Sequence, residues 1–369
     1  MPTASILEHF STLEDPRIDQ QKKHQLQDIL FITLCAVISG ADNWVMIEQF
    51  GKAKVDWFTQ PLGLKNGIPS HDTLGYVFAA LDPEPFSECF SRWVADLAQL
   101  TQGEVIAIDG KTLRRSLDSA SKKAAIHIVS AWAQQNRLVL GQEKVDEKSN
   151  EITAIPKLLE RLGVTGAVVT VDAMGWQKKI ARQIIGQGGD YVLSLKGNQG
   201  ALHDDVATWF QSARSTQEAT VEVDAGHGRI ETRQVRTSSD IQWLKARHPD
   251  WTGLQSIVEV TSQREVTQKT QTQVRYFISS LDGRHPIPIG QGVRGHWGIE
   301  NSVHWVLDVA FDEDRNRARK GHSATNLARI RHLALNLIEQ EKTTKVGGKT
   351  KRAKAGWVHH YLLKILGMI

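Results

Sequence analysis

The sequence predicts an α/β protein: a mixed five-stranded sheet with helices, interrupted by a β-rich insertion and preceded by an all-α N-terminal domain. Three observations carry this prediction. The first hundred residues show helical periodicity and clear helix starts. From Glu104 the pattern changes to short apolar runs typical of strands, with helices between the later ones. Residues 206–290 alternate in Thr- and Val-rich segments before helical periodicity returns.

Composition is that of a globular protein with more than one domain. The chain has 369 residues and is 40% hydrophobic, which is enough to bury two or three cores. Its two cysteines, Cys35 and Cys89, lack the spacing of a disulfide framework or a zinc knuckle. No secretory signal is visible, and the apolar run 29–38 is too short to span a bilayer. We therefore expect a cytoplasmic protein without membrane contact.

The charge is unevenly distributed along the chain. Residues 1–100 hold 7 Lys/Arg against 13 Asp/Glu, whereas residues 315–369 hold 13 against 2, and the whole chain carries +4. The Lys-rich stretch 342–354 suits a polyanion such as DNA, whose counterions are released when its phosphates are neutralised. A basic tail that is only solvated accounts for the charge equally well. We expect residues 341–369 to form a basic C-terminal tail with a short helix.

The N-terminal domain, residues 1–100, is expected to contain four helices. They cover residues 26–38 and 44–50, a stretch opened by PSHDT at residues 69–73, and a stretch after Asp82-Pro83. Asp82 is a favourable N-cap because its carboxylate can accept from the first free backbone amides, and proline suits the first helical position.

Five strands are expected in residues 101–205, in the order β-β-β-α-β-α-β. They are the runs IAID, AIHIVSAW, RLVLGQEKV, GAVVTVDA and YVLSLKG. A right-handed crossover returns the fourth strand beside the first, which places Asp109 and Asp172 at neighbouring strand ends. This order describes a ribonuclease-H-like sheet. Val105 stands where a phosphate loop ending at Gly110-Lys111-Thr112 needs glycine, and no G-x-G-x-x-G follows the first strand, so nucleotide-binding loops are rejected.

Further catalytic-domain helices are expected over residues 291–340. There His296, Glu300, His304 and Asp308 recur every fourth residue and share one helix face. A zinc site from the two histidines fits this spacing, although the pattern H-E-x-x-H is absent.

Three acids in this arrangement suit a metal site. Asp109, Asp172 and Glu300 offer hard oxygen ligands for Mg²⁺, with Mn²⁺ as an alternative, and two such ions can align the attacking and leaving oxygens at a phosphodiester. Each acid taken alone could equally cap a turn or form an ion pair. Asp308 is the alternative third ligand because it lies on the same helix face as Glu300.

Five blocks of the sequence resemble a known family. IAIDGKTLRRS, DEKSNEITAIPKLL, VDAMGWQKKIA, YVLSLKGNQG and HWGIENSVHWVLDVAFDED are similar to the signature blocks of bacterial insertion-sequence DDE transposases, specifically the H-repeat-associated group. The resemblance runs from residue 69 to residue 338. It implies that Asp109, Asp172 and Glu300 are the catalytic, metal-binding triad. It also implies cleavage at the element's terminal inverted repeats and transfer of the freed 3′-hydroxyl into target DNA.

The resemblance implies double-stranded DNA as the partner, a homodimer when two ends are synapsed, and work at the nucleoid. The Tyr, Arg and Lys that the wider superfamily places around its glutamate are replaced here by Val293, His296 and Leu307. The following residues are candidates for contacts with DNA: Lys111, Lys196, Asn198, Arg294 and His296 for phosphates, and Trp176 for stacking on an unpaired base. An exposed turn explains Lys196 and Asn198 equally well, and packing explains Trp176.

End recognition is expected in the N-terminal domain, on the helix opened by PSHDT with His71, Asp72 and Tyr76. A domain with net negative charge is poorly suited to binding DNA, so this helix could nearly as well contact another protein. The alternative readers are the arginines of the insertion, Arg229, Arg233 and Arg236. Two other functions fit the chain: a decayed or domesticated relative that only binds DNA, and a ribonuclease-H-like nuclease without strand transfer.

Overall fold

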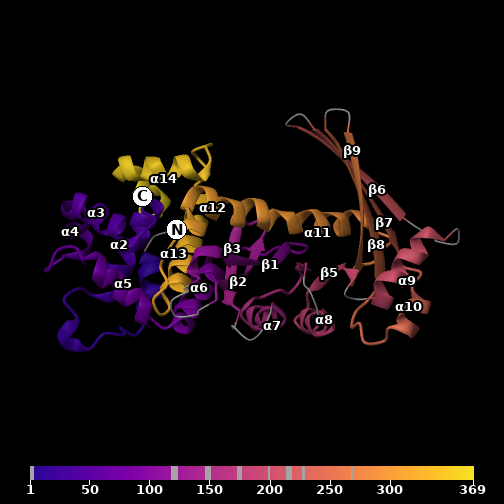
Figure 1. Ribbon diagram of the computed structural model, residues 1–369, viewed down its shortest axis with the longest axis horizontal. Coiled ribbons are helices and arrows are strands. Elements are labelled where there is room, and N and C mark those ends of the chain that lie inside the picture. The colour runs from indigo at the N-terminus through magenta and orange to yellow at the C-terminus, as the bar shows by residue number, and fades with distance from the viewer. Residues whose placement is uncertain are drawn as a thin grey trace.

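The computed structural model describes residues 4–117, 124–145, 151–172, 177–197, 200–212, 218–226, 229–266 and 269–369. The molecule is elongated: the N-terminal helices lie at one end, the central sheet in the middle and the long strands of the insertion at the other end (Figure 1). None of the helices in these ranges is long and apolar enough to cross a membrane.

The N-terminal domain is helical, as expected. Its helices are α1 (Ala4–His9), α2 (Leu26–Ile38), α3 (Trp44–Ala53), α4 (Val55–Leu62), α5 (His71–Ala80) and α6 (Pro83–Leu97). The expected N-cap is present, because the Asp82 carboxylate accepts from the amide of Glu84. Ser70 caps α5 in the same way through the amide of Thr73. Helix α2 is buried on nearly every side and forms the centre of this domain.

The central sheet has the ribonuclease-H-like order that the sequence predicts. Its strands are β1 (Val105–Leu113), β2 (Ile126–Ala133), β3 (Leu138–Lys144), β4 (Val168–Val171) and β5 (Asp190–Leu195), joined after β3 by α7 (Glu151–Arg161) and α8 (Gln177–Gly186). Strand β4 pairs in parallel with β1 and with β5. One expectation is wrong: Asp109 does not end its strand. The parallel pairing with β4 stops at Ile108, but the antiparallel pairing with β2 carries β1 on to Leu113.

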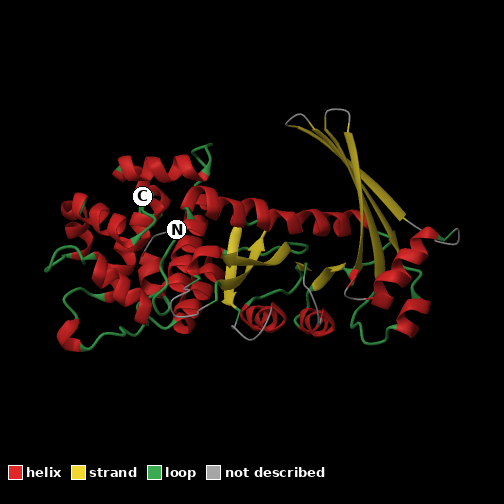
Figure 2. Ribbon diagram, in the orientation of Figure 1, coloured by secondary structure: helices red, strands yellow, loops and turns green. Residues whose placement is uncertain are grey.

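The insertion extends the central sheet and is not a separate layer. It contains α9 (Gly200–Gln211), β6 (Glu218–Gly226), β7 (Arg229–Ser238), α10 (Gln242–Arg247), β8 (Ser256–Val266) and β9 (Lys269–Ser279). Because β9 pairs antiparallel with β5, a single nine-stranded sheet results, in the order β3-β2-β1-β4-β5-β9-β8-β7-β6. The strands of the insertion project beyond the body of the molecule (Figure 2).

A long helical segment crosses the sheet and connects the insertion with the N-terminal helices (Figure 1). It consists of α11 (Pro286–Ile299), a π-helical turn η4 (Glu300–His304) and α12 (Trp305–Phe311). Gly295 allows α11 to pack closely on β1, since a Cβ atom there would lie 2.7 Å from Cγ1 of Val105. The helix that carries Glu300 is therefore held directly against the strand that carries Asp109.

The C-terminal segment is folded and is not a free tail. Helix α13 (Ser323–Gln340) is buried up to Ile338 and packs on α2, α5 and α6. It is followed by α14 (Gly348–Trp357) and α15 (His359–Ile365), with α14 in contact with α2, α12 and α13. Lys351 and Arg352, two of the basic residues of the expected tail, are buried. Part of the positive charge in this segment is therefore used inside the protein.

Candidate catalytic site

The register of two parallel strands brings the predicted aspartates to the same level. Ile108 of β1 pairs with Val171, the last residue of β4, and Asp109 and Asp172 directly follow these two residues in the chain. Glu300 reaches this place from the junction of α11 and η4. All three acids line one cavity of about 230 Å³. The three carboxylates that the sequence singles out are thus brought together.

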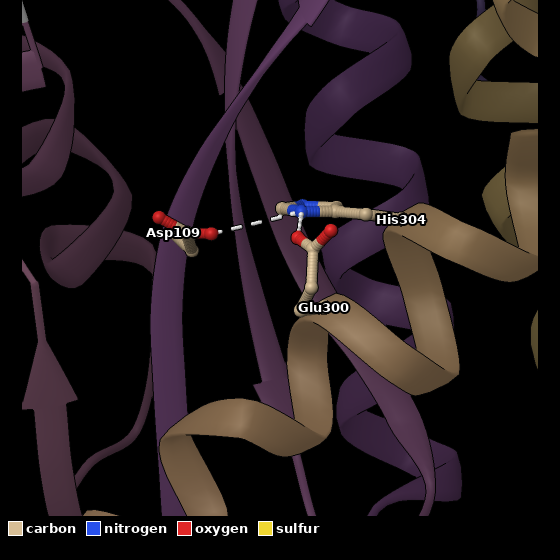
Figure 3. Close-up of side chains that lie close together, drawn as sticks. All are labelled: Asp109, Glu300 and His304. Carbon is tan, nitrogen blue, oxygen red and sulfur yellow. Dashed lines mark hydrogen bonds and ion pairs between the residues drawn. The ribbon is translucent and has the colours of Figure 1, made fainter. Parts of the chain in front are cut away.

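A histidine lies between two of these acids. His304 Nδ1 is 2.9 Å from Glu300 Oε2 and 3.6 Å from Asp109 Oδ2 (Figure 3). Glu300 and His304 occupy the two ends of the π-helical turn, a rare geometry that is frequent at functional sites. The Nε2 atom of His304 is buried and has no hydrogen-bond partner in the described part of the chain. From the sequence, His304 was a possible zinc ligand with His296 or, alternatively, a histidine that faces the core or caps a helix, and it is indeed buried.

Burial shapes the electrostatics of the site. It raises the pKa of the Asp109 carboxyl, while the nearby His304 and His296 act in the opposite direction. Burial also lowers the pKa of His296, so this imidazole is neutral near pH 7. Its Nδ1 lies 3.1 Å from the hydroxyl of Thr170 on β4. A cation bound beside Asp109 would counteract the effect of burial, because it would stabilise the ionised carboxylate.

The donor set fits a divalent cation. Ligand atoms of Asp109, Glu300 and His304 all lie within 4.8 Å of one another, which offers two carboxylates and an imidazole nitrogen to one ion. Asp172 lies in the same cavity but is paired with Lys196, whose Nζ is 3.1 Å from Asp172 Oδ1. An ion bound to Asp172 would take the place of this ammonium group.

Comparison with known proteins identifies the family. Residues 100–337 match the family model described as "Transposase DDE domain", and residues 7–94 match the model of its associated domain. The chain belongs to the DDE transposase family. This transposase is 40% identical over 373 residues to the "H repeat-associated putative transposase YhhI" of Escherichia coli K12, which covers 99% of this chain and 98% of that protein. The resemblance to the H-repeat-associated group is thereby confirmed.

Other relatives differ in how much of the transposase they match. The "Uncharacterized protein in dhlA 3'region" of Xanthobacter autotrophicus is 47% identical over 277 residues, which is 73% of this chain and 92% of that protein. The "Inactive transposase YbfQ" of Escherichia coli K12 is 44% identical over 77 residues, 21% of this chain and 92% of that protein. Among solved structures, a piggyBac transposase synaptic complex with hairpin DNA aligns with a TM-score of 0.46 and 10% identity, covering 99% of this chain and 80% of that chain.

Lys111 of the transposase does not face the cavity. Its ammonium group donates to the backbone oxygen of His304 and forms ion pairs with Asp308 and, at 3.1 Å, with Glu313. The side chain is only 12% exposed. This placement does not fit the expected phosphate contact, because the donors of Lys111 already have oxygen partners. The ion pair with Lys111 also gives Asp308, the alternative third ligand, a structural role.

The other candidate residues of the transposase have different surroundings. Arg294 on α11 forms ion pairs with Glu222 and Asp224 of β6, at 2.9 and 3.0 Å, and so ties the helix to the insertion. Trp176 and Asn198 lie outside the described residues. Gly110 follows Asp109, and the paired side chains of His127 and Glu151 lie where a Cβ atom of this residue would be, so a larger residue does not fit here.

The cavity also contains an arginine and a tryptophan that the sequence did not single out. Arg275 of β9 and Trp297 of α11 both line it beside the three acids. Trp297 precedes Glu300 by three residues, so helical spacing alone could have placed it on the same face. Arg275 gives no such signal, because its position depends on the pairing of β9 with β5.

Proposed function

We propose that this chain is an active transposase that uses two metal ions to cut DNA at the ends of its insertion element and joins the freed 3′-hydroxyl to target DNA. The convergence of Asp109, Asp172 and Glu300 on one cavity carries this proposal. These carboxylates would hold Mg²⁺, or Mn²⁺ in its place. Bound ions would supply the charge that activates the attacking oxygen and stabilises the leaving oxygen.

The chain's own residues prepare the cavity for this reaction. His304 orients Glu300 through the bond to Nδ1, and the contact of Lys111 with the backbone of His304 fixes the π-helical turn on β1. Thr170 orients the neutral ring of His296 at the cavity wall. Such supporting contacts keep ligands in place before any ion binds, which reduces the reorganisation that binding requires.

Basic residues beside the site support double-stranded DNA as the partner. The short helices η2 (Arg114–Ser116) and η5 (Glu313–Arg315) lie in contact, one after β1 and the other after α12. They and the following loop carry exposed cations, namely Arg114, Arg115, Arg315, Arg317 and Lys320. We propose that this surface contacts phosphates of the element ends, that two copies synapse two ends as a homodimer, and that the protein acts at the nucleoid in the cytoplasm.

The proposal is tested with the full-length protein, Mg²⁺ and a labelled duplex that carries the terminal repeat of the element. Asp109→Asn, Asp172→Asn and Glu300→Gln should each abolish cleavage and leave binding of the duplex largely unchanged, because each variant loses a metal ligand and no surface cation. Asp204→Asn, at an exposed acid of α9, is the matched control. Triad variants that cut as fast as the unchanged protein would refute the assignment.

The same assay separates the two other functions. A decayed relative binds the duplex without cutting it, and the existence of a relative named "Inactive transposase YbfQ" keeps this alternative in view. A ribonuclease-H-like nuclease cuts the duplex but yields no joined product when unlabelled target DNA is added. Strand-joined product from the unchanged protein contradicts both.

A further inference from the structure

The insertion brings an arginine into the catalytic cavity. Leu195 of β5 pairs with Tyr276 of β9, so Arg275 lies across from Lys196, just beyond the last paired residue of β5. Arg275 lines the cavity together with Asp109, Asp172 and Glu300. It is the sole Lys or Arg among the described residues that line this cavity. The insertion, and not the helix that carries Glu300, therefore supplies the arginine of this cavity.

Among the described residues, no acid forms an ion pair with the guanidinium of Arg275, which is held in place by an aromatic ring. It lies over the ring of Trp297, 5.3 Å from the ring centre, and Trp297 is 50% exposed. Its Nε atom is buried and bonds to none of the residues described in the structure. Burial lowers the pKa of Arg275, while the charge of Asp172 acts in the opposite direction. A buried, unused donor costs free energy, which indicates a ligand that supplies oxygen atoms.

The neighbouring cations are already engaged. Arg294 is paired with Glu222 and Asp224. Lys111 is paired with Asp308 and Glu313. Lys196 is paired with Asp172, so its charge offsets that of a triad member. Arg275 differs from all of them because its donors remain available at the cavity.

We propose that Arg275 binds the non-bridging oxygens of the DNA phosphodiester that is cut in the cavity, with Trp297 as the surface that holds the guanidinium flat. The proposal rests on the transposase activity proposed above and adds the residue that positions its substrate. A planar guanidinium matches two phosphate oxygens at once, whereas a lysine offers only a point charge.

The test uses the full-length protein and the terminal-repeat duplex, with the cleaved phosphate either natural or replaced by an uncharged methylphosphonate. Affinity is measured in Ca²⁺, and the cutting rate of natural duplex in Mg²⁺. Arg275→Ala should weaken binding of natural duplex roughly ten- to hundredfold, the range for a hydrogen bond to a charged group. It should change binding of the methylphosphonate duplex little. Arg275→Lys should retain part of the affinity but cut slowly, since it keeps the charge and loses the planar donors.

Arg264→Ala is the matched control because Arg264 lies on the same face of the sheet, exposed and outside the cavity. Arg264→Ala should weaken binding of the two duplexes by the same factor, or leave binding of both unchanged. If Arg275→Ala loses the same affinity for both duplexes, or cuts natural duplex at an unchanged rate, the role of Arg275 is overturned. The transposase proposal then still stands. Failure of the unchanged protein to cut natural duplex overturns the transposase proposal, and the role of Arg275 with it. Thermal melting of each variant shows whether it is folded.

Discussion

His332 is a buried histidine on α13 that takes no part in the proposed reaction. Its Nδ1 has no hydrogen-bond partner within the described ranges. Burial lowers its pKa to about 3, and electrostatic interactions with His304, Lys111 and Arg329 add to the effect. The imidazole therefore stays neutral in the folded protein at pH 7 and at pH values well above 3. In the unfolded chain a histidine has a pKa of about 6.5.

This difference predicts a pH-dependent stability. Between about pH 6.5 and about pH 3 the unfolded chain binds a proton that the folded protein does not, so the free energy of unfolding falls as the pH falls. The loss from this residue is about 1.4 kcal/mol per pH unit. Urea unfolding near pH 7 and near pH 5.5 should show that the free energy of unfolding falls less between these pH values for His332→Leu than for the unchanged protein. His360→Leu, at an exposed position, should lose as much free energy of unfolding between these pH values as the unchanged protein. An equal loss of free energy of unfolding in all three proteins would contradict the prediction.

At the residue scale, the sequence predicts the acids of the site but not their supporting residues. Asp109 and Asp172 follow apolar strands, and that local signal depends on no distant contact. The contact of His304 with Glu300 follows the i, i+4 spacing that the sequence shows, but its contact with Asp109 depends on how this helix packs against β1 and has no local signal. The place of Arg275 requires the pairing of β9 with β5, more than seventy residues apart. The ion pairs of Lys111 could not be predicted either, because its acidic partners lie about two hundred residues away in the chain.

At the scale of elements, helix α14 is fixed by one buried arginine. Arg352 is 3% exposed, donates to the backbone oxygen of Val37 and pairs with Asp42 at 2.7 Å. Its guanidinium lies 4.1 Å from the ring centre of Phe311. One side chain thus connects the C-terminal segment with α2 and α12. Composition showed the positive charge of this segment but not that part of it faces inward.

We expect Arg352→Ala to lower the free energy of unfolding by about 3 to 5 kcal/mol, because the half-buried Asp42 would lose its partner and the backbone oxygen of Val37 would lose its buried donors. Lys349→Ala, at an exposed position of the same helix, should change it by less than about 0.5 kcal/mol. Chemical denaturation of both variants checks this. A mild effect of Arg352→Ala would mean that α14 is held by its apolar contacts instead.

At the scale of the whole molecule, the N-terminal domain and the catalytic domain share one core. Helix α13 follows the catalytic helices in the chain, yet it packs on α2, α5 and α6. Asn326 of α13 donates to the backbone oxygens of Phe78 and Leu81 at the end of α5. The sequence predicts the helices of both regions but not this packing, because amphipathic spacing does not show which distant surface a helix face will meet.

This shared core predicts that the catalytic region does not fold without residues 1–100. Their removal would expose the buried face of α13 to water, and a chain of residues 101–369 should show no cooperative thermal transition. Tyr76→Ala, at an exposed position of α5, should keep the melting temperature of the unchanged protein. It is therefore the better variant for asking whether α5 reads element ends. Cooperative melting of residues 101–369 alone would show two independent domains.

The π-helical turn also bears on how the coding sequence of this helix can change in length. A π-helical turn holds one residue more than an α-helical one. Loss of a single codon between Glu300 and His304 would therefore turn it into an α-helical turn and leave the helix after it in nearly the same rotation. Loss of a codon within α12, before Asp308, would instead rotate the residues after it by about 100°. Only in the first case would Asp308 stay beside Lys111, so the turn is a position at which one codon can be lost without changing which side chains face β1.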